Sequence, residues 1–344
     1  MIGSAVAVLA SDDGEEWPAQ GRAAIQSTLR IVTSGIPGWA LRWGDALANA
    51  WLRRTANPLA SKIEAVRSLV NGPGVSIMNL CYEWGCTTSL RRSGGAISMV
   101  RTVDWPFQGI GRFVTVLIEP SPHGPVAFVT WPGFVGAVTA FAPGRFCVAV
   151  NKAPIPYRSG ALRVDQALAA LESFGSGGLP ITHLVRVAAL QSPTFETVVD
   201  RIAACERVTT PGIISIGGTA TGEAVVMERD RTRAEIRQAA DDRLCVANDW
   251  VAPSRRGWPP AGGRTPEDKR RDCRVRVAAL QDAPVPDLAD FSWLAPPILN
   301  RNTRAAIACC PATGRLAIQG YDWVDNGPRP VTEALSLTLA MRER

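Results

Sequence analysis

The pattern of hydrophobic and polar positions divides the chain into alternating helical and extended stretches. Between residues 17 and 70, apolar residues recur at three- and four-residue spacing, which predicts helices. From residue 75 the pattern changes to short apolar runs separated by Gly and Pro, which predicts a long antiparallel meander. The predicted strands are VSIMNLCY, CTTSLRR, GAISMVRTVD, RFVTVLIEP, PVAFVTW and RFCVAVN.

Helical spacing returns between residues 161 and 208, in three segments, and Thr194 is a plausible N-cap of the third. Strands follow over 212–249, then a basic helix at about 266–281, then a final strand pair in AAIACCP and RLAIQGYDW. This order predicts an α+β fold with two antiparallel sheets and helices packed outside them. The glycine-rich SIGGTATGEA lies between two of these strands, so we interpret it as a hairpin turn. The Pro-rich loop at 251–266 is expected to be a mobile lid or pocket rim.

One predicted helix concentrates tryptophan on a single face, formed by Trp39, Trp43, Leu47, Ala50 and Trp51. Three tryptophans on one helical face usually indicate core packing, which is the favoured interpretation. The alternative is a surface that faces lipid or substrate, because indole suits the boundary between apolar and aqueous phases.

Composition limits the class of protein. With 344 residues, 46% of them hydrophobic, the chain can form one large domain or two ordinary ones around a real core. The net charge of +6 is spread along the sequence and accompanies no recognition motif, so a nucleic-acid partner is not expected. No apolar run approaches the ~18 residues of a membrane span. The start lacks the basic region of a signal peptide, and the eight cysteines show no CxxC pair, which favours a reducing, cytoplasmic setting.

Few catalytic chemistries remain possible. His123 lies in a turn and His183 in a helix where packing explains it, so neither favours a Ser-His-Asp triad, and no GxSxG motif occurs. A cysteine nucleophile without histidine needs another base. The nucleophile's own α-amine, with a pKa of about 7.7–8.0, serves once the preceding peptide bond is cut. The Gly85–Cys86 bond fits this role, because glycine does not hinder attack on its carbonyl.

Arg101 and Asp104 lie on the return strand of the same predicted hairpin, and a carboxylate such as Asp104 would orient the new amine. An offset of three residues places two side chains on opposite faces of a strand. Bringing both to Cys86 therefore requires a bulge or an early end to the strand near Thr102.

The segment NLCYEWGCTTSLRRSGGAISMVRTVDWP resembles the region around the nucleophile of acid ceramidase and N-acylethanolamine-hydrolysing acid amidase. These are cysteine N-terminal-nucleophile (Ntn) hydrolases, related more distantly to choloylglycine hydrolases and penicillin V acylases. Further blocks are similar in the same order, over roughly residues 76–275: WPGFVGAVTAFAPGRFCVAVNKAP, GIISIGGTATGEAVVMERDR, and LCVANDW with GGRTPEDKRR. The resemblance implies an αββα four-layer sandwich, made as a precursor and cut before Cys86 into residues 1–85 and 86–344.

The resemblance also implies site residues. Cys86 matches the nucleophile and, through its freed amine, the base, while Arg101 and Asp104 match the family's paired Arg and Asp. Asn248 matches the asparagine that donates to the oxyanion, a contact typically worth ~3 kcal/mol of barrier. Two further matches are Asn151, a second asparagine near that pocket, and Arg264, a late arginine of the site.

One position departs from the family. Lys152 stands where the family has a glutamate after the asparagine, so a substrate with an anionic head group becomes conceivable. We expect Lys152, Trp131 and Trp250 to lie near the substrate.

The resulting hypothesis is an autoprocessed amidase that cleaves N-acyl amides with a fatty or aromatic acyl group through a Cys86 thioester. It needs no metal or organic cofactor. Peripheral membrane or lipid contact through the Trp-rich N-terminal helices is a further expectation. An acyltransferase of the same fold remains an alternative, as does a non-catalytic lipid- or partner-binding protein that has lost processing.

Overall fold

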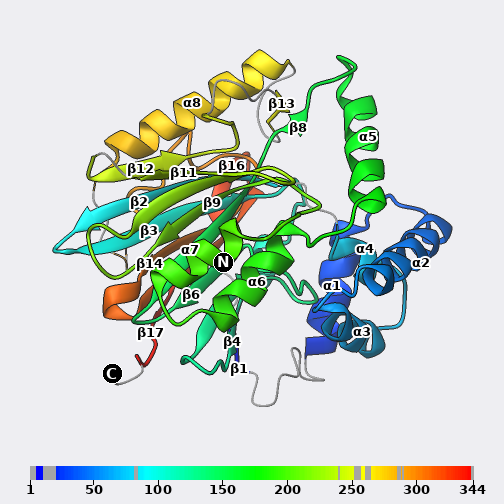
Figure 1. Ribbon diagram of the computed structural model, residues 1–344, viewed down its shortest axis with the longest axis horizontal. Coiled ribbons are helices and arrows are strands. Elements are labelled where there is room, and N and C mark those ends of the chain that lie inside the picture. The colour runs from blue at the N-terminus through cyan, green and yellow to red at the C-terminus, as the bar shows by residue number, and fades with distance from the viewer. Residues whose placement is uncertain are drawn as a thin grey trace.

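Two stacked β-sheets with helices outside them form the body of the molecule (Figure 1). The computed structural model describes residues 5–10, 21–80, 84–238, 241–251, 257–259, 265–284, 288 and 290–341. The α+β class with two largely antiparallel sheets, expected from the sequence, is confirmed.

The first sheet has eight strands, in the order β1-β4-β5-β6-β7-β9-β10-β11. All neighbours pair antiparallel except β1 and β4, which are parallel. The strands are β1 (Ala7–Ala10), β4 (Thr115–Glu119), β5 (Val126–Thr130), β6 (Thr139–Ala142), β7 (Phe146–Lys152), β9 (Gly212–Gly217), β10 (Ala224–Arg229) and β11 (Ala234–Gln238).

The second sheet has seven strands, in the order β12-β2-β3-β14-β15-β16, with β17 also paired to β15. Its strands are β2 (Gly85–Ser93), β3 (Ala96–Asp104), β12 (Arg243–Val246), β14 (Thr303–Cys310), β15 (Arg315–Val324), β16 (Gly327–Pro330) and β17 (Leu335–Thr338). A separate two-stranded ribbon joins β8 (Ile155–Pro156) to β13 (Gly257–Trp258). Two 3₁₀ turns connect strands, η2 (Gly111–Phe113) and η3 (Pro311–Thr313).

Helices cover the outer face of each sheet and complete four layers. The apolar residues of α6 (Ile181–Gln191) and α7 (Phe195–Ala203) pack on the first sheet. On the second sheet lies α8 (Pro266–Asp282), through Leu280 among others. The largest core cluster fills the space between the two sheets. Alternate residues of the buried central strands therefore face either this inner core or an outer helix layer.

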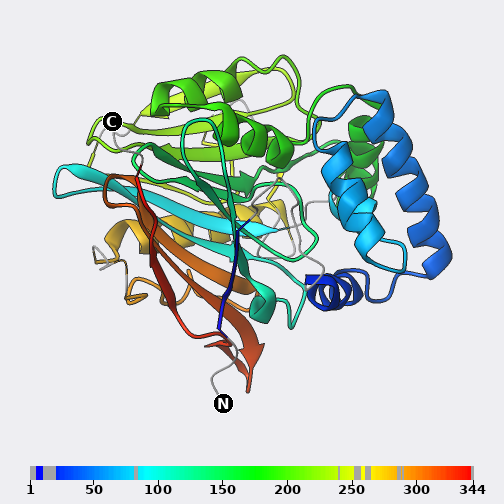
Figure 2. The ribbon, with the colours of Figure 1, turned by 90° about the horizontal axis from the view of Figure 1, so that it is seen from below.

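The remaining helices gather at one end of the sandwich, as both views show (Figures 1 and 2). Four of them form a helical cap, which we define as residues 21–80: α1 (Arg22–Val32), α2 (Gly38–Arg54), α3 (Ala60–Leu69) and α4 (Val75–Met78). The fifth, α5 (Leu162–Gly175), meets the end of α2, where Trp51 Nε1 donates to the Ser176 carbonyl over 3.3 Å.

The prediction of a strand at 75–82 is wrong over Val75–Met78, which form the short helix α4. The reason lies some thirty residues earlier in the chain. The buried carboxylate of Asp45 accepts hydrogen bonds from the backbone N–H groups of Gly74 (2.6 Å) and Ile77 (3.0 Å). These donors belong to the first turn of α4, so a side chain from α2 provides the cap that the local sequence lacks.

The prediction that the tryptophan-bearing face of α2 (Gly38–Arg54) packs in the core is also wrong for most of its residues. Trp39, Trp43 and Leu47 are 64%, 67% and 61% exposed, whereas Trp51 is buried. The opposite side of α2, through residues such as Leu41 and Leu52, packs against the rest of the cap. Helical periodicity identified a face correctly, but the helix buries the other one.

Other local expectations agree with the structure. The Thr194 hydroxyl accepts from Thr197 N over 3.2 Å and caps α7, and SIGGTATGEA forms the turn between β9 and β10. The predicted lid at 251–266 lies largely outside the described residues. Among the helices that are described, none combines the length and the apolar character that a membrane crossing requires.

Candidate active site

Cys86 is the second residue of β2 and belongs to the inner core. It pairs with Val103 of β3, and its side chain is fully buried between the sheets. The strand runs without a break through the Gly85–Cys86 bond, so the structure describes the uncut chain.

Arg101 lies on the same face of the sheet as Cys86, because its cross-strand partner is Thr88, two residues along β2. Its Nη2 is 2.9 Å from Cys86 Sγ and also donates to the Val150 carbonyl over 3.1 Å. Its Nη1 donates to the Val138 carbonyl over 2.6 Å. The guanidinium is therefore held in place by the first sheet and directed at the thiol.

The Cys86 thiol is nevertheless a poor nucleophile in the uncut chain. Burial raises its pKa to about 11, against the opposing effect of Arg101, and the negative charge of Asp104 adds to the rise. At neutral pH the sulfur is protonated, so a base must remove its proton before it can attack.

Asp104 lies on the other face of the sheet, as the three-residue offset from Arg101 requires. It pairs with Gly85 and points toward the layer of α8, and β3 carries no bulge that would turn it inward. The irregularity in this region belongs to the neighbouring strand β14, between Thr303 and Ala305. The expectation that a bulge or strand end brings Asp104 and Arg101 to one face is therefore wrong: Arg101 contacts Cys86 on the inner face of the sheet, whereas Asp104 lies on the outer face near Arg276.

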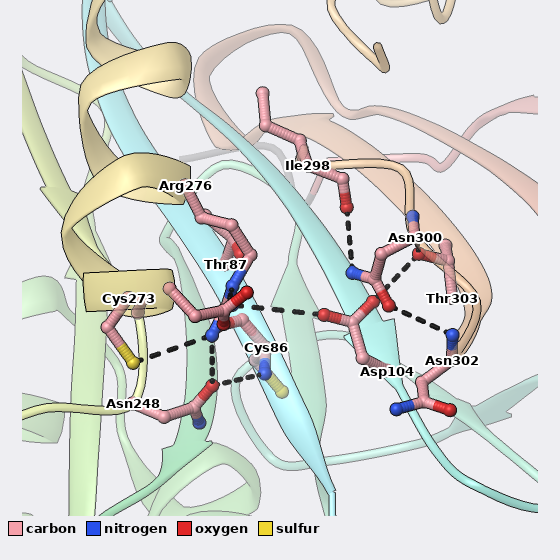
Figure 3. A network of polar contacts seen from close by, with 12 residues as sticks. Cys86, Thr87, Asp104, Asn248, Cys273, Arg276, Ile298, Asn300, Asn302 and Thr303 are labelled. Carbon is pink, nitrogen blue, oxygen red and sulfur yellow. Dashed lines mark hydrogen bonds and ion pairs between the residues drawn. The ribbon is translucent and has the colours of Figure 1, made fainter. Parts of the chain in front are cut away.

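Asp104 is held as a buried carboxyl group (Figure 3). Its Oδ1 accepts from the Thr303 hydroxyl over 2.9 Å, while its Oδ2 accepts no hydrogen bond. Burial raises its pKa, and Arg276, whose Nη1 is 3.9 Å from Oδ2, acts in the opposite direction.

Two groups bind the backbone of Cys86 at the edge of β2 where β12 has ended. The peptide N–H of Cys86 donates to Asn248 Oδ1 over 2.7 Å, and its carbonyl accepts from Arg276 Nη1 over 2.8 Å. Both partners replace the ladder hydrogen bonds that a longer β12 would make. Asn248 Nδ2 meanwhile donates to the Lys152 carbonyl over 2.9 Å.

Arg276 is the residue that sequence reasoning missed. It projects from α8, is almost fully buried, and also donates to Thr87 Oγ1 over 2.6 Å and to Asp272 over 2.8 Å (Figure 3). Burial alone would lower its pKa, but Cys273, Asp104 and Asp272 together raise it, so it stays a cation. The basic helix was predicted, yet nothing in its run of arginines marks which one turns inward.

The other predicted site residues lie at different distances from the nucleophile. Asn151, on β7, accepts from Thr88 Oγ1 over 2.8 Å and donates to the Ala247 carbonyl over 2.9 Å, so it links the two sheets beside Cys86. Trp131 is buried, stacks edge-on with Trp105, and donates to the Ile110 carbonyl. Trp250 is half-buried beside α8. Arg264 lies outside the described residues.

A largely apolar cavity of about 210 Å³ lies near Cys86, which is not itself among the residues that line it. Two of its lining residues, Trp84 and Val150, are neighbours of the reactive pair: Trp84 is two residues before Cys86, and the Val150 carbonyl contacts Arg101. Lys152 also lines it, together with one face of α5. Neither Trp131 nor Trp250 is among its lining residues.

No metal centre is formed by the described part of the chain, where no three His, Cys, Asp or Glu side chains gather closely enough to hold an ion. The site instead consists of a thiol, two buried arginines, a carboxyl group and two carboxamides. This set suits nucleophilic attack by sulfur, with charge held by fixed donors.

Comparison with known proteins finds relatives that are named as amidases. The chain is 30% identical to the N-acylethanolamine-hydrolyzing acid amidase of Cavia porcellus over 224 residues, and 27% identical to that of Mus musculus over 213 residues. These matches cover 62% and 60% of this chain, and 59% and 56% of the relatives, so the chain spans less than two thirds of their length. No family model matches the sequence.

Among solved structures, the Caenorhabditis elegans ortholog of that amidase superposes with a TM-score of 0.52 at 16% identity, over 66% of this chain and 93% of that one. The fold is that of an Ntn hydrolase. The resemblance expected from the nucleophile segment is confirmed, and the four layers of this Ntn hydrolase fold hold Cys86 at the start of a central strand.

Proposed function

We propose that this chain is a cysteine Ntn amidase that cuts its own Gly85–Cys86 bond and then hydrolyses N-acyl amides. The observation that carries the proposal is the contact between Arg101 Nη2 and Cys86 Sγ, at the residue that directly follows a glycine. Support comes from the relatives, which are named as N-acylethanolamine-hydrolyzing amidases.

In maturation, Cys86 Sγ attacks the Gly85 carbonyl and forms a C–S bond. The C–N bond to Cys86 then breaks, and the thiol proton passes to the departing Cys86 nitrogen, which leaves the Gly85 acyl group on sulfur as a thioester. Water then hydrolyses the thioester and leaves a carboxylate on Gly85 and a free α-amine on Cys86. The fragments would be residues 1–85 and 86–344. The new ammonium replaces a peptide N–H that donates to Asn248 Oδ1. We expect it to turn toward Asp104, whose Oδ2 accepts no hydrogen bond before the cut.

In turnover, the α-amine takes the proton of the thiol and Cys86 Sγ attacks the substrate carbonyl. The amine then protonates the departing nitrogen, and water hydrolyses the acyl thioester. Asn248 would donate to the developing oxyanion after its Nδ2 releases the Lys152 carbonyl. The cavity beside Trp84 accommodates an apolar acyl group, and Lys152 at its wall favours a substrate with an anionic end.

We further propose a reducing, cytoplasmic location. The seven cysteines in the described part of the chain all carry free thiols, five of them buried. Fractionation of producing cells with antibody detection tests this location.

The test of function combines intact mass, N-terminal sequencing and hydrolysis of a fluorogenic N-acyl aminocoumarin. The wild-type protein should yield two polypeptides, one beginning CTTSL, and should release the fluorophore. Cys86→Ala should remain one polypeptide and be inactive. Cys245→Ala, a half-buried thiol on β12, is the matched control and should be cut like the wild type. A hydrolytically active preparation that is still uncut at Gly85 would falsify the mechanism. An uncut, inactive protein would support a non-catalytic binding role instead.

A further inference from the structure

We propose that the acyl group of the substrate ends in a carboxylate, which Arg231 binds at the wall of the apolar cavity. The substrates are then N-(ω-carboxyacyl) amides, the half-amides of dicarboxylic acids. This inference rests on the proposed amidase function and specifies which end of the substrate carries the negative charge. Arg231 follows β10 and is one of the residues that line the cavity.

The charges at the cavity wall have one sign. Of the residues that line it in the described part of the chain, Lys152 and Arg231 are cations and none is an Asp or Glu. Most of the other lining residues are apolar, so a charge inside the cavity is screened less than one at the surface. An acyl chain that ends in a methyl group gains nothing from these cations, whereas a chain that ends in a carboxylate is attracted to them.

Arg231 shares its counter-ion with a second arginine. Its Nη2 lies 3.3 Å from Glu172 Oε2, and the same carboxylate is bound by both terminal nitrogens of Arg158. The three side chains together therefore carry a net positive charge. Burial lowers the pKa of Arg231, Glu172 opposes this effect, and Arg158 adds to it. A further anion beside Arg231 would balance the excess charge.

Polar groups lie beside Arg231 at this part of the wall. Its Nη2 donates to the Ala169 carbonyl over 3.3 Å and to Ser173 Oγ over 3.4 Å, both on the cavity side of α5. The Arg231 carbonyl accepts from Val208 N over 2.9 Å, two residues before Thr210, which also lines the cavity. A guanidinium with hydroxyl groups next to it supplies the donors that a carboxylate accepts from.

Arg231 is separated from the reactive sulfur by two strand spacings. Cys86 Sγ lies 3.8 Å from the Val150 carbonyl of β7, and β9 lies between β7 and β10 in the first sheet. Two strand spacings amount to about 10 Å, and Arg231 is two residues beyond Arg229, the last residue of β10. In the proposed function the acyl group occupies the cavity and its carbonyl meets Cys86. A carboxylate at Arg231 therefore belongs to the far end of the acyl chain and not to the leaving amine.

Binding to the uncut Cys86→Ala protein tests this inference without catalysis. Isothermal titration compares the mono-(2-hydroxyethyl)amide of suberic acid with N-(2-hydroxyethyl)octanamide, which has a methyl group in place of the carboxylate. The suberic acid compound should bind about tenfold more tightly. The corresponding amide of succinic acid is too short to reach Arg231 and should have no such advantage over N-(2-hydroxyethyl)butanamide.

Variants in the same background identify the residue that recognises the carboxylate. Arg231→Met should remove the advantage of the suberic acid compound, and Glu172 stays paired with Arg158, so the fold should persist and can be checked by thermal unfolding. Lys152→Met removes the other cation of the cavity and should weaken the advantage less than Arg231→Met does. The matched control is Arg163→Met, an exposed arginine of α5 outside the cavity lining, which should keep the full advantage.

Three results would overturn the inference. They are equal affinities of the suberic and octanoic compounds, an equal advantage for the succinic compound, and a larger loss in Lys152→Met than in Arg231→Met. The last of these would place the charge near the leaving amine. Because binding is measured on a protein that cannot react, a wild type that is uncut or inactive would count against the proposed function alone.

Discussion

At the scale of single residues, the site depends on side chains that approach one strand from both faces. Cys86 and Arg101 face the inner core, while Asp104 and Arg276 meet on the side of α8. The backbone of Cys86 connects the two groups, since its carbonyl is bound by Arg276. A change on the α8 side is therefore transmitted to the nucleophile without touching its sulfur.

Arg276 offers the sharpest test at this scale. Arg276→Gln would leave the buried Asp104 without a cation and should lower the free energy of unfolding by about 3–5 kcal/mol. Urea titration in the Cys86→Ala background measures this loss on a single, uncut polypeptide. Arg274→Gln, two residues away and exposed on the same helix, should leave the midpoint unchanged. Equal effects of the two substitutions would show that Arg276 does not hold Asp104.

The sequence pointed to Cys86, Arg101 and Asp104 through the resemblance of the nucleophile segment and through their place in one predicted hairpin. It could state that Arg101 and Asp104 point to opposite faces, but not that both faces would be used. It could not find Arg276, since the helix 266–282 carries arginine on several sides and only packing decides which one is buried.

At the scale of elements, α5 defines the cavity. One side of this helix, including Ala169, lines the apolar space beside Trp84, while the opposite side faces outward. The helix has a single buried residue, Asp165, which accepts from the backbone of Ser159 over 2.9 Å. Its inner side is thus available to substrate rather than committed to packing.

A pair of substitutions on α5 tests which part of the substrate the cavity receives. Ala169→Phe should raise KM for long-chain N-acyl aminocoumarins by about tenfold or more, because the ring occupies space that a long acyl chain needs. Hydrolysis of the N-acetyl compound should change little. Ala167→Phe adds the same ring on the outward side of the same helix and should be neutral for both substrates. A comparable loss toward long and short chains would mean that the acyl group binds elsewhere.

Two helices, α4 and α2, differ from what the sequence predicted. Val75–Met78 reads as a strand, and it becomes a helix because Asp45, distant in sequence, supplies its N-terminal hydrogen bonds. The prediction that the tryptophans of α2 pack in the core was wrong for a related reason: these residues recur with helical periodicity, but the helix buries its other side. In both cases the missing information is a tertiary contact.

At the scale of the whole molecule, His183 fastens the helical cap to the sandwich. From α6 its Nδ1 lies 3.1 Å from Asn57 Oδ1, and its Nε2 lies 3.1 Å from the Asn79 carbonyl. Both partners belong to the cap. Burial lowers the pKa of His183 to about 3, so the ring is neutral in the folded protein across the ordinary pH range.

This lowered pKa makes stability depend on pH. Between pH 6.5 and 3 the unfolded chain, with an ordinary histidine pKa of about 6.5, binds the extra proton. The free energy of unfolding should therefore fall on acidification below pH 6.5, by up to about 1.4 kcal/mol per pH unit from this group. Urea titrations of Cys86→Ala at pH 7.5, 6 and 5 should show this slope, and adding His183→Gln should reduce it. His123→Gln, in a surface turn, should keep the parent slope, whereas identical slopes for all three proteins would exclude His183 as the source.

The pairing of the edge strand β1 affects whether the two fragments stay together after the proposed cut at Gly85. This strand precedes the proposed cut, yet it pairs with β4 from residues beyond it, and the cap is bound by His183 from beyond it as well. A cut at Gly85 would therefore not release the fragment 1–85. Its β1 would remain paired with β4 in the first sheet, and its helical cap would remain in contact with His183. The two fragments would therefore separate only when the protein unfolds.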